Sequence, residues 1–483
     1  MKKKYFLSFF AALLLCSAGC NKVLDVPGNA GAQIVTSQVF TDSANATAGV
    51  LGLYQGVTNS PLTGRGVNYY TSLSGDEGFS NNASIFAQLG LSLPEQDFYN
   101  DAVSTGTINL SGETALLWSN PYGALGIFGA NTAMEGINAD HDSSLSLSAR
   151  NQLIGECKTL RAYHYFSLVN LFGDVPLVLS TDWKTTALLP RASADAVYAQ
   201  ITKDLQDASG LLSGTYPSAG RQRPNRYVAL GLLARVYLYR KQWDLARAMV
   251  DSVIGSGLYS LVPTLDNIFL DKSTEAIWQI GNSDLNSPKT APGMGDFVPL
   301  SAGVPPTIAL NPSFAHAFET GDKRKTSWTR NLLTVNLTTL KIDTLVSQYK
   351  YRNTSTTTVA AGAEDLMVLR LAEMYLIRAE AVAQLGDPAT AMSDVNVIRK
   401  RAGLPAAFAS NLSEAMGIIL HERQVELFVE GHRWFDLKRV DSVNAVMARV
   451  KPQYWPVDGH AALYPLPYTE LSRDVNLVQN PGY

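Results

Sequence analysis

Cysteine is scarce in this sequence: its 483 residues include three cysteines, Cys16, Cys20 and Cys157. The first two fall in or directly after an N-terminal segment that has the features of a signal peptide, so a mature chain would keep Cys20 and Cys157. If Cys20 is acylated, no internal disulfide can form and a cysteine-based metal site is excluded. We therefore expect the stability of the protein to come from packing.

Charged residues are also few, at 17% of the sequence, and the net charge is −3. Outside the first four residues there is no block of lysine and arginine. Proteins that bind nucleic acid usually carry a basic patch or stripe, so we expect no nucleic-acid partner. Apolar residues make up 46% of the chain, which is ample for a core of two or three domains or of one large helical body.

Long apolar runs are missing except at the N-terminus. Lys2–Lys4 precede an apolar stretch, Tyr5–Leu15, and together they form the charged and apolar regions of a signal peptide. That stretch is too short to span a bilayer, and no other segment stays apolar for about 18 residues. The sequence therefore predicts export and no spanning helix.

The residues directly before Cys20, Ser17–Gly19, are small. Small residues ahead of a cysteine resemble a bacterial lipobox, in which the cysteine is acylated and becomes the mature N-terminus. We predict a lipoprotein signal peptide at residues 1–19, lipidation of Cys20, and a polar tether at residues 20–37. Two or three acyl chains on Cys20 would anchor the protein durably. The alternative is ordinary secretion with cleavage near Ala18.

Residues 38–483 are expected to form one body with two kinds of segment. Residues 62–111 and 281–360 show no sustained periodicity and are expected to form long, irregular, ligand-binding loops. Residues 112–280 and 361–483 have apolar residues at steps of three and four, which indicates a helical scaffold. The predicted fold class is therefore mostly α.

Two predicted pairs of helices carry small residues at the same interval. Ala234 and Ala246 are 12 residues apart across one turn, and Ala379 and Ala391 have the same separation across another. Small residues at that interval let antiparallel helices approach closely, as in tetratricopeptide repeats. The pattern predicts a tetratricopeptide-like α–α superhelix.

The C-terminal third carries the two most distinctive motifs. The first is HERQVELFVEGHRWFDLKR at residues 421–439, and the second occupies residues 463–483, beginning LYPLP and ending LVQNPGY. Both resemble motifs of the SusD/RagB family of outer-membrane lipoproteins. Similar stretches at residues 160–176, 229–239 and 369–380 extend the resemblance over nearly the whole chain.

The resemblance implies a helical-repeat body whose irregular loops bind glycans or, in some members, peptides. It also implies a lipid-anchored outer-membrane protein facing the cell exterior, which delivers its ligand to a SusC-like TonB-dependent transporter. Whether the ligand is starch-like, another glycan, a host glycan or a peptide stays open. The alternatives to a binding protein are a surface glycosidase or peptidase and an assembly scaffold.

Glu422, Glu426 and Glu430 stand four residues apart in the first motif, a spacing at which like charges on a helix repel. Such a row is stable only if arginines lie between the carboxylates. We expect these among Arg161, Arg235, Arg378, Arg423, Arg433 and Arg439. Guanidinium partners lower a carboxyl pKa, whereas the general acid of a glycosidase needs a raised one, so we interpret the row as structural.

The sequence contains no assembled catalytic or metal-binding motif. His421 and Glu422 begin like the HExxH of zinc proteases, but Val425 stands where the second histidine ligand should be. His164 and Cys157 lie on an apolar helical stripe, which indicates a hydrogen-bonded core histidine and a buried, inert thiol. We therefore predict no catalytic residues, no metal and no cofactor.

Ligand recognition is expected in the two irregular segments, because loop side chains vary while a rigid scaffold fixes their position. Aromatic faces suit sugar rings, and Asn and Asp suit their hydroxyl groups. The predicted ligand-binding residues are Asp76, Phe79, Asn81, Phe98, Tyr99, Asn282, Asp284, Phe297 and Trp328. The alternative for each aromatic residue is that it fixes its loop to the helical body.

Lipidation of Cys20 is tested by removing the atom that would be acylated. A Cys20→Ala variant should leave the membrane fraction, because it has no thiol to carry the acyl chains that anchor the protein. The measurement is membrane fractionation followed by immunoblotting, with Cys16→Ala as a matched control that stays bound. A Cys20→Ala protein held as firmly as the wild type contradicts the prediction.

Overall fold

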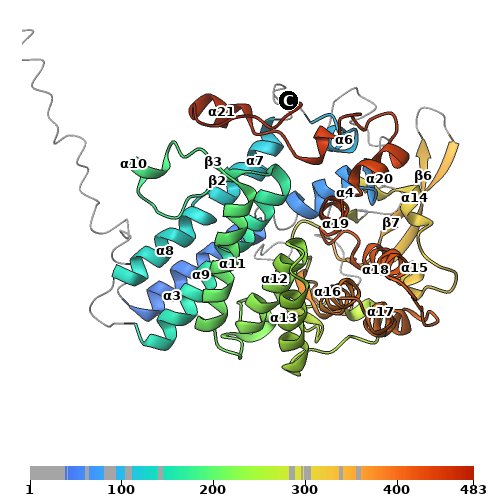
Figure 1. The fold of residues 1–483 in the computed structure, drawn as a ribbon, viewed down its shortest axis with the longest axis horizontal. Helices are drawn as coiled ribbons and strands as arrows, with labels where there is room; N and C mark the ends of the chain where they lie inside the picture. The colour runs from blue at the N-terminus through green and yellow to red at the C-terminus, as the bar shows by residue number, and fades with distance from the viewer. Residues whose placement is uncertain are drawn as a thin grey trace, which may run out of the picture.

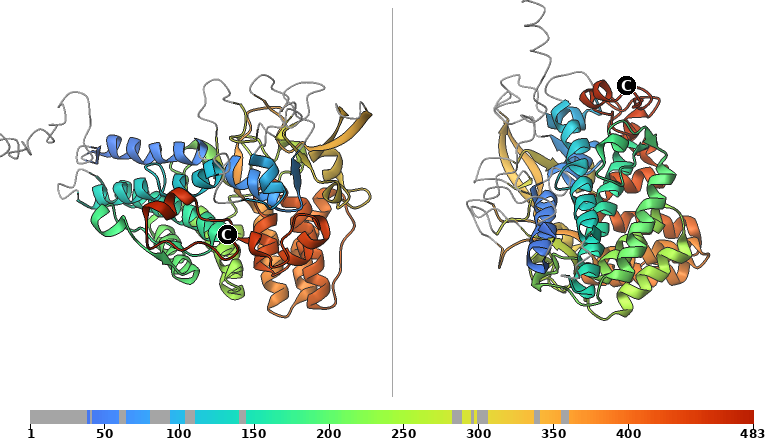
Figure 2. Two further views of the ribbon diagram at one scale, coloured as in Figure 1. Left: turned by 90° about the horizontal axis from the view of Figure 1, so that it is seen from above. Right: turned by 90° about the vertical axis from the view of Figure 1, so that its left-hand side faces the viewer.

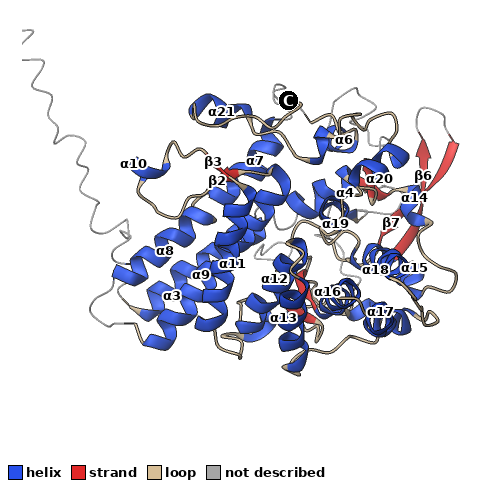
Figure 3. Ribbon diagram, in the orientation of Figure 1, coloured by secondary structure: helices blue, strands red, loops and turns tan. Residues whose placement is uncertain are grey.

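The computed structural model describes residues 39–40, 42–59, 65–80, 94–103, 111–139, 145–281, 289–294, 297–298, 306–336, 341–354 and 360–483. Cys20 and the predicted tether lie outside the described residues. Helices dominate the described parts, and the strands are short (Figures 1 and 3). The predicted fold class, mostly α with a helical-repeat body, is confirmed.

The N-terminal part of the body is built around one long helix, α9 (Leu147–Phe172). The Ser146 hydroxyl caps its start by accepting a hydrogen bond from the backbone N–H of Ala149 at 3.2 Å. The helix ends at Gly173, which takes a positive φ of 75°. The helices packed against α9 are α3 (Ser43–Asn59), α7 (Ser111–Tyr122), α8 (Ile127–Ala139) and α11 (Ala194–Leu211).

The predicted repeat pairs are α12 (Arg226–Tyr239) with α13 (Trp243–Gly255) and α16 (Leu371–Gln384) with α17 (Pro388–Ala402). Side chains cap two of these helices, with Asn225 preceding α12 and Asp387 preceding α17. The alanines at the 12-residue interval are all fully buried, as close helix packing requires: Ala234, Ala246, Ala379 and Ala391. The helices α11, α12, α13, α16 and α17 pack one on the next in that order (Figure 1).

The remaining elements connect and cover the repeats. The helices are η2 (Arg65–Tyr69), α4 (Tyr70–Ser74), α6 (Pro94–Tyr99), α10 (Trp183–Thr186), η3 (Ala219–Arg221), η4 (Leu265–Asn267), α14 (Pro312–Ala315), α15 (Lys323–Trp328), α18 (Leu412–Leu427), α19 (Arg433–Arg439), α20 (Val443–Val450), η6 (His460–Ala462) and α21 (Tyr468–Arg473). The strands pair antiparallel: β1 (Gly78–Ser80) with β5 (Ile308–Leu310), β2 (Val175–Pro176) with β3 (Arg191–Ala192), β4 (Ala276–Ile280) with β8 (Leu366–Arg370), and β6 (Thr329–Asn336) with β7 (Lys341–Gln348).

The two segments predicted to be irregular contain regular structure. Within residues 62–111 lie η2, α4, β1 and α6, and within residues 281–360 lie β5, α14, α15 and the β6–β7 hairpin. Most of these elements are three to six residues long, too short to show a period in the sequence. The hairpin lies at the end of the molecule opposite α8 (Figures 1 and 2).

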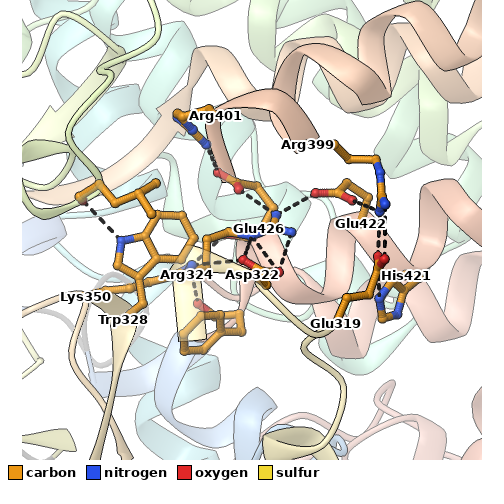
Figure 4. A network of polar contacts seen from close by, with 12 residues as sticks. Glu319, Asp322, Arg324, Trp328, Lys350, Arg399, Arg401, His421, Glu422 and Glu426 are labelled. Carbon is orange, nitrogen blue, oxygen red and sulfur yellow. Dashed lines mark hydrogen bonds and ion pairs between the residues drawn. The ribbon is translucent and has the colours of Figure 1, made fainter. Parts of the chain in front are cut away.

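The glutamates of the first C-terminal motif are buried and lie on α18 and in the turn after it. Figure 4 shows two of them, Glu422 and Glu426, among their partners. Glu426 accepts hydrogen bonds from Arg370 Nη1 at 2.6 Å and from Arg324 Nη1 at 3.0 Å, and it also pairs with Arg401. Burial alone would raise the pKa of the Glu426 carboxyl, but Arg401, Arg370 and Arg324 together hold it well below its usual range. Glu426 is therefore an ionised carboxylate in the interior.

Its two neighbours in the row are paired in the same way. Glu422 binds Arg324 and Arg399, and Glu430 binds Arg370 and Lys350. The expectation that cations separate the glutamates is correct, but the expected partners were wrong. Those six arginines pair with other acids: Arg161 with Asp204, Arg235 with Glu373, Arg378 with Asp394, Arg423 with Asp436, Arg433 with Asp76, and Arg439 with Glu380.

The pKa shifts along the row are not uniform. Burial acts to raise the pKa of Glu430, but Arg370 and Lys350 outweigh it and the pKa is lowered. At Glu422, burial outweighs Arg324, and the pKa is raised. The expectation of a lowered pKa therefore holds for two of the three glutamates. Both oxygens of Glu422 still accept hydrogen bonds from arginines.

Two further expectations concern the stripe on α9. Cys157 is fully buried, and burial raises the pKa of its thiol, which keeps it protonated. His164 is buried as expected, and burial lowers its pKa to about 4. The expectation that His164 is hydrogen-bonded was wrong. Neither of its ring nitrogens has a hydrogen-bond partner within the described residues. None of the helices in the described ranges has the length and apolar character needed to cross a membrane.

Removing the Glu426 carboxylate should leave three buried guanidinium groups short of a partner. A Glu426→Ala variant should lose on the order of 3 kcal/mol of unfolding free energy at pH 7, measured by urea denaturation. Because the pKa of Glu426 is lowered in the folded state, its contribution is complete above the unfolded-state value of ~4.3 and is lost as the pH falls below it. Glu414→Ala, on the exposed start of the same helix, is the control and should cost below about 1 kcal/mol. Equal losses for the two variants would show that the row does not stabilise the fold.

Candidate functional site

Three of the predicted ligand-binding aromatic residues are buried. Phe98 and Trp328 are 0% exposed and Phe297 is 1% exposed. The Trp328 indole N–H donates a hydrogen bond to the carbonyl of Leu265 at 3.1 Å, and the Phe98 ring packs against Tyr70 with centroids 4.3 Å apart. The structure contradicts the prediction that these three side chains contact a ligand. Their large apolar rings fill the space between the short segments and the helical body instead.

Asp76 is also buried and forms an ion pair. Its carboxylate accepts hydrogen bonds from Arg433 Nε and Nη2, both at 2.7 Å, and from Gln424 Nε2 at 3.3 Å. This ion pair ties the segment before β1 to the C-terminal motif, so Asp76 has no free oxygen with which to bind a ligand. Of the other predicted residues, Asn81, Asn282 and Asp284 lie outside the described residues.

The remaining two predicted residues, Phe79 and Tyr99, lie side by side and are partly exposed. Their ring centroids are 6.4 Å apart with an interplanar angle of 59°. Tyr99 in turn packs against Tyr454 at 5.9 Å, and the Lys451 ammonium lies 4.9 Å from the centre of the Tyr99 ring. These contacts hold Tyr99 in place, and Tyr99 supports one side of Phe79.

Phe79 borders a surface pocket of about 310 Å³. The β1–β5 pair, the short helices α14 and α15, and the β6–β7 hairpin enclose it. Its other lining residues are Leu310, Pro312, Ala315, His316, Lys325, Thr329, Asn331, Thr344, Leu345 and Val346. A pocket of this volume is at the lower end of the range for small-molecule sites, so it suits part of an oligosaccharide.

Local capping positions the two short helices beside the pocket. Asn311 Oδ1 accepts a hydrogen bond from the backbone N–H of Ser313 at 3.0 Å, and Pro312 begins α14. Asp322 Oδ1 accepts one from the backbone N–H of Arg324 at 2.9 Å and so begins α15. These turns place His316 after α14 and Lys325 on α15.

The third wall follows from the register of the hairpin. Asn331 is opposite Val346 and Leu333 is opposite Thr344. Directly opposed residues of an antiparallel pair lie on the same face, and alternate residues of a strand share a face. Asn331, Thr344 and Val346 therefore stand together on one face of the hairpin, and the pocket lies against that face.

The glutamate row holds this hairpin at both ends. Arg324, just before β6, bonds to Glu422 and Glu426. Lys350, just after β7, donates hydrogen bonds to the Glu426 carbonyl at 2.8 Å and to Glu430 Oε1 at 2.7 Å. The Lys350 ammonium also lies 4.7 Å from the centre of the Trp328 ring, at the end of α15 (Figure 4). The hairpin wall of the pocket is thus fixed to the helical body by buried charge.

The lining combines an apolar floor with a polar rim. Phe79, Leu310 and Val346 present carbon surface, while Asn331 and Thr344 offer amide and hydroxyl groups. This combination suits a sugar ring, which has apolar C–H faces and a rim of hydroxyl groups. The sequence predictions missed every lining residue except Phe79. Residues 329–336 and 341–348 do not alternate strictly between apolar and polar, so periodicity alone did not indicate the hairpin.

A buried carboxyl, that of Glu77, lies two residues before Phe79 in the chain. Glu77 precedes β1, and its Oε2 accepts a hydrogen bond from the backbone N–H of Val429 at 3.3 Å. Burial and the neighbouring charge of Asp76 raise the pKa of Glu77 to about 8. The turn that meets it is strained, because Val429 is β-branched and takes a positive φ of 53°. Glu77 is therefore mostly protonated at neutral pH.

The cavities found beside the repeat helices are much smaller than the pocket. One of about 30 Å³ is bordered by Arg235, Tyr239 and His432, and one of about 10 Å³ lies between α9, α11 and α12. Spaces of this size hold one water molecule at most. Among the residues that the structure describes, no group of three or more His, Cys, Asp or Glu side chains is arranged to hold a metal ion.

Two sequence-family models match the chain. The model described as "SusD family" matches residues 317–483, and the model described as "Starch-binding associating with outer membrane" matches residues 65–238. A protein of Formosa agariphila named SusD-like protein P2 is 26% identical to the chain, and the match covers 100% of both sequences. The matches include both the pocket segment and the C-terminal motif.

Solved structures share the fold over most of the chain. A SusD superfamily protein of Bacteroides vulgatus superposes with a TM-score of 0.77 at 19% identity, over 92% of this chain and 100% of the other. A structure described as a laminarin-binding SusD-like protein superposes with a TM-score of 0.75 at 24% identity, also over 92% and 100%. Because both sequence identities are below 25%, the superpositions show that the fold is shared and nothing further.

The raised pKa of Glu77 predicts a pH-dependent stability. In the unfolded state the Glu77 carboxyl loses its proton above a pH of ~4.3, whereas in the folded state it keeps the proton up to a pH of about 8. The unfolding free energy should therefore fall as the pH rises between these two values. The slope from this group can reach about 1.4 kcal/mol per pH unit. A Glu77→Gln variant should lack this slope and be more stable than the wild type at pH 8, measured by urea denaturation between pH 5 and 8.

The control for this prediction is Asp441→Asn in an exposed turn, which should keep the wild-type pH dependence. A Glu77→Gln profile parallel to that of the wild type would mean that Glu77 does not hold the proton.

Proposed function

The chain belongs to the SusD family, and we propose that it binds oligosaccharides at the outer membrane without cleaving them. In this proposal Cys20 carries the lipid anchor, the pocket faces the cell exterior, and the bound ligand passes to a SusC-like TonB-dependent transporter. The family descriptions, which name starch binding and the outer membrane, support the binding role and the location.

The observation that carries the proposal is the pocket beside Phe79. It offers an aromatic ring, an apolar wall, the Asn331 amide and the Thr344 hydroxyl on a frame held by buried ion pairs. A preformed site of this kind binds a sugar without ordering a loop. Because the pocket is small, affinity should lie in the micromolar to millimolar range. Fast release at such affinities suits a protein that hands its ligand onward.

The arrangement of carboxylates argues against a glycosidase. Hydrolysis requires two carboxyl groups on either side of the scissile bond, one of them with a raised pKa. No carboxylate lines the pocket within the described residues. The glutamates nearest in sequence to the lining are Glu77 and Glu319. Glu77 is buried and bonded to the backbone N–H of Val429, and Glu319 is paired with Arg399. We therefore propose binding and transfer, with no catalytic step.

Replacement of the aromatic ring tests the proposed site. Phe79→Ala should weaken binding of laminarin or starch oligosaccharides at least tenfold, or about 1.4 kcal/mol, measured by isothermal titration calorimetry. Phe408→Ala is the matched control, because Phe408 is 83% exposed and lies outside the pocket. Far-ultraviolet circular dichroism should be unchanged in both variants.

Three outcomes would contradict the proposal. If a broad panel of oligosaccharides shows no binding to the folded wild-type protein, the binding role is wrong. If incubation with a polysaccharide releases shorter products, the absence of catalysis is wrong. Equal affinity of the wild type and Phe79→Ala would place the site elsewhere.

A further inference from the structure

The ionisable side chains that line the pocket in the described part of the chain are both basic. Lys325 and His316 line it and are exposed to solvent, and the lining residues that the structure describes include no aspartate or glutamate. The chain as a whole has more acidic than basic residues, with a net charge of −3. A basic rim without acidic neighbours is therefore a local feature of the pocket.

The carboxylates nearest in sequence do not neutralise Lys325. Asp322 binds Arg324 with N–O distances of 2.8 to 3.2 Å, and Glu319 pairs with Arg399. Lys325 itself makes no ion pair within the described residues. Its ammonium thus stays hydrated at the rim, while the adjacent guanidinium of Arg324 is 0% exposed and fully paired. A ligand can reach the first cation but not the second.

Resting on the proposed function, we propose that the ligand is an acidic oligosaccharide, whose carboxylate or sulfate group lies at the rim between Lys325 and His316. The apolar face of the sugar ring packs on Phe79, and its hydroxyl groups meet Asn331 and Thr344 on the hairpin. Charge-assisted hydrogen bonds from the ammonium select the charged ligand over its neutral counterpart. The interaction is open to solvent, so its effect on affinity is modest and salt-dependent.

Matched pairs of oligosaccharides test the charge requirement. Oligogalacturonides are compared with their methyl esters for the carboxylate, and sulfated laminarin oligosaccharides with unsulfated ones for the sulfate. The wild type should bind the acidic member of at least one pair about three- to tenfold more tightly in calorimetry at low salt. The preference should shrink between about 0.05 and 0.5 M salt.

Substitutions of Lys325 and His316 test whether these two residues cause the preference for the acidic ligand. Lys325→Gln should remove most of the preference and Lys325→Gln with His316→Gln should remove all of it, while affinity for the neutral member stays within about twofold. Lys323→Gln is the matched control on the same helix, because the Lys323 side chain lies over Gly403 and does not line the pocket. Its preference should equal that of the wild type.

The possible failures are distinguishable. Equal or tighter binding of the neutral members by the wild type overturns the acidic ligand while leaving glycan binding intact. The same conclusion follows if the double variant keeps the preference, or if only unrelated neutral glycans bind. If no glycan binds at all, the proposed function itself is wrong. A preference for the carboxylate pair alone or the sulfate pair alone identifies the acidic group.

Discussion

The buried row of glutamates on α18 and in the turn after it is the constraint on which the remaining structure depends. A carboxylate in the interior costs several kcal/mol unless cations surround it, and the cations here come from separate parts of the chain. Arg324 and Lys350 flank the hairpin, Arg370 ends β8, and Arg399 and Arg401 end α17. The charges balance only when the hairpin, the β4–β8 pair and the last repeat helix have all reached their places. We infer that the row specifies the assembly of the C-terminal half more than it adds net stability, since apolar side chains of similar volume could stabilise an interior equally well.

The same row connects the scaffold to the proposed binding surface. The two strands that form one wall of the pocket lie between Arg324 and Lys350, which are both bonded to the row. The wall is therefore fixed to the helical body. The residues facing the pocket, such as Asn331 and Lys325, have no part in that network. Their side chains can change between relatives without disturbing the buried charges. A rigid frame with exchangeable surface residues is the arrangement expected for proteins that share a fold and differ in ligand.

Sequence reasoning predicted what depends on local or periodic patterns. Asn225 and the turn at Gly386 marked helix ends, and the spacing of Ala234 and Ala246 marked a close helix pair; the structure has both. Sequence reasoning failed where contacts between residues far apart in the chain determine the structure. The glutamate row was evident, but its partners are 23 to 102 positions away in the sequence and no local pattern identifies them. Trp328 and Phe79 both looked like sugar-binding aromatics. Whether such a ring is buried or exposed depends on how its segment packs against distant segments. The strands here are too short to show a period in the sequence that would indicate this packing.

The central claim is that a glycan occupies the pocket between β1–β5 and the β6–β7 hairpin. The most direct measurement is a crystal structure of the protein soaked with an oligosaccharide to which it binds in solution. The account predicts electron density for a sugar ring against Phe79, with hydroxyl groups within hydrogen-bonding distance of Asn331 or Thr344. Density for the ligand in the groove of the repeat helices α12, α13, α16 and α17, with the pocket unoccupied, would contradict it.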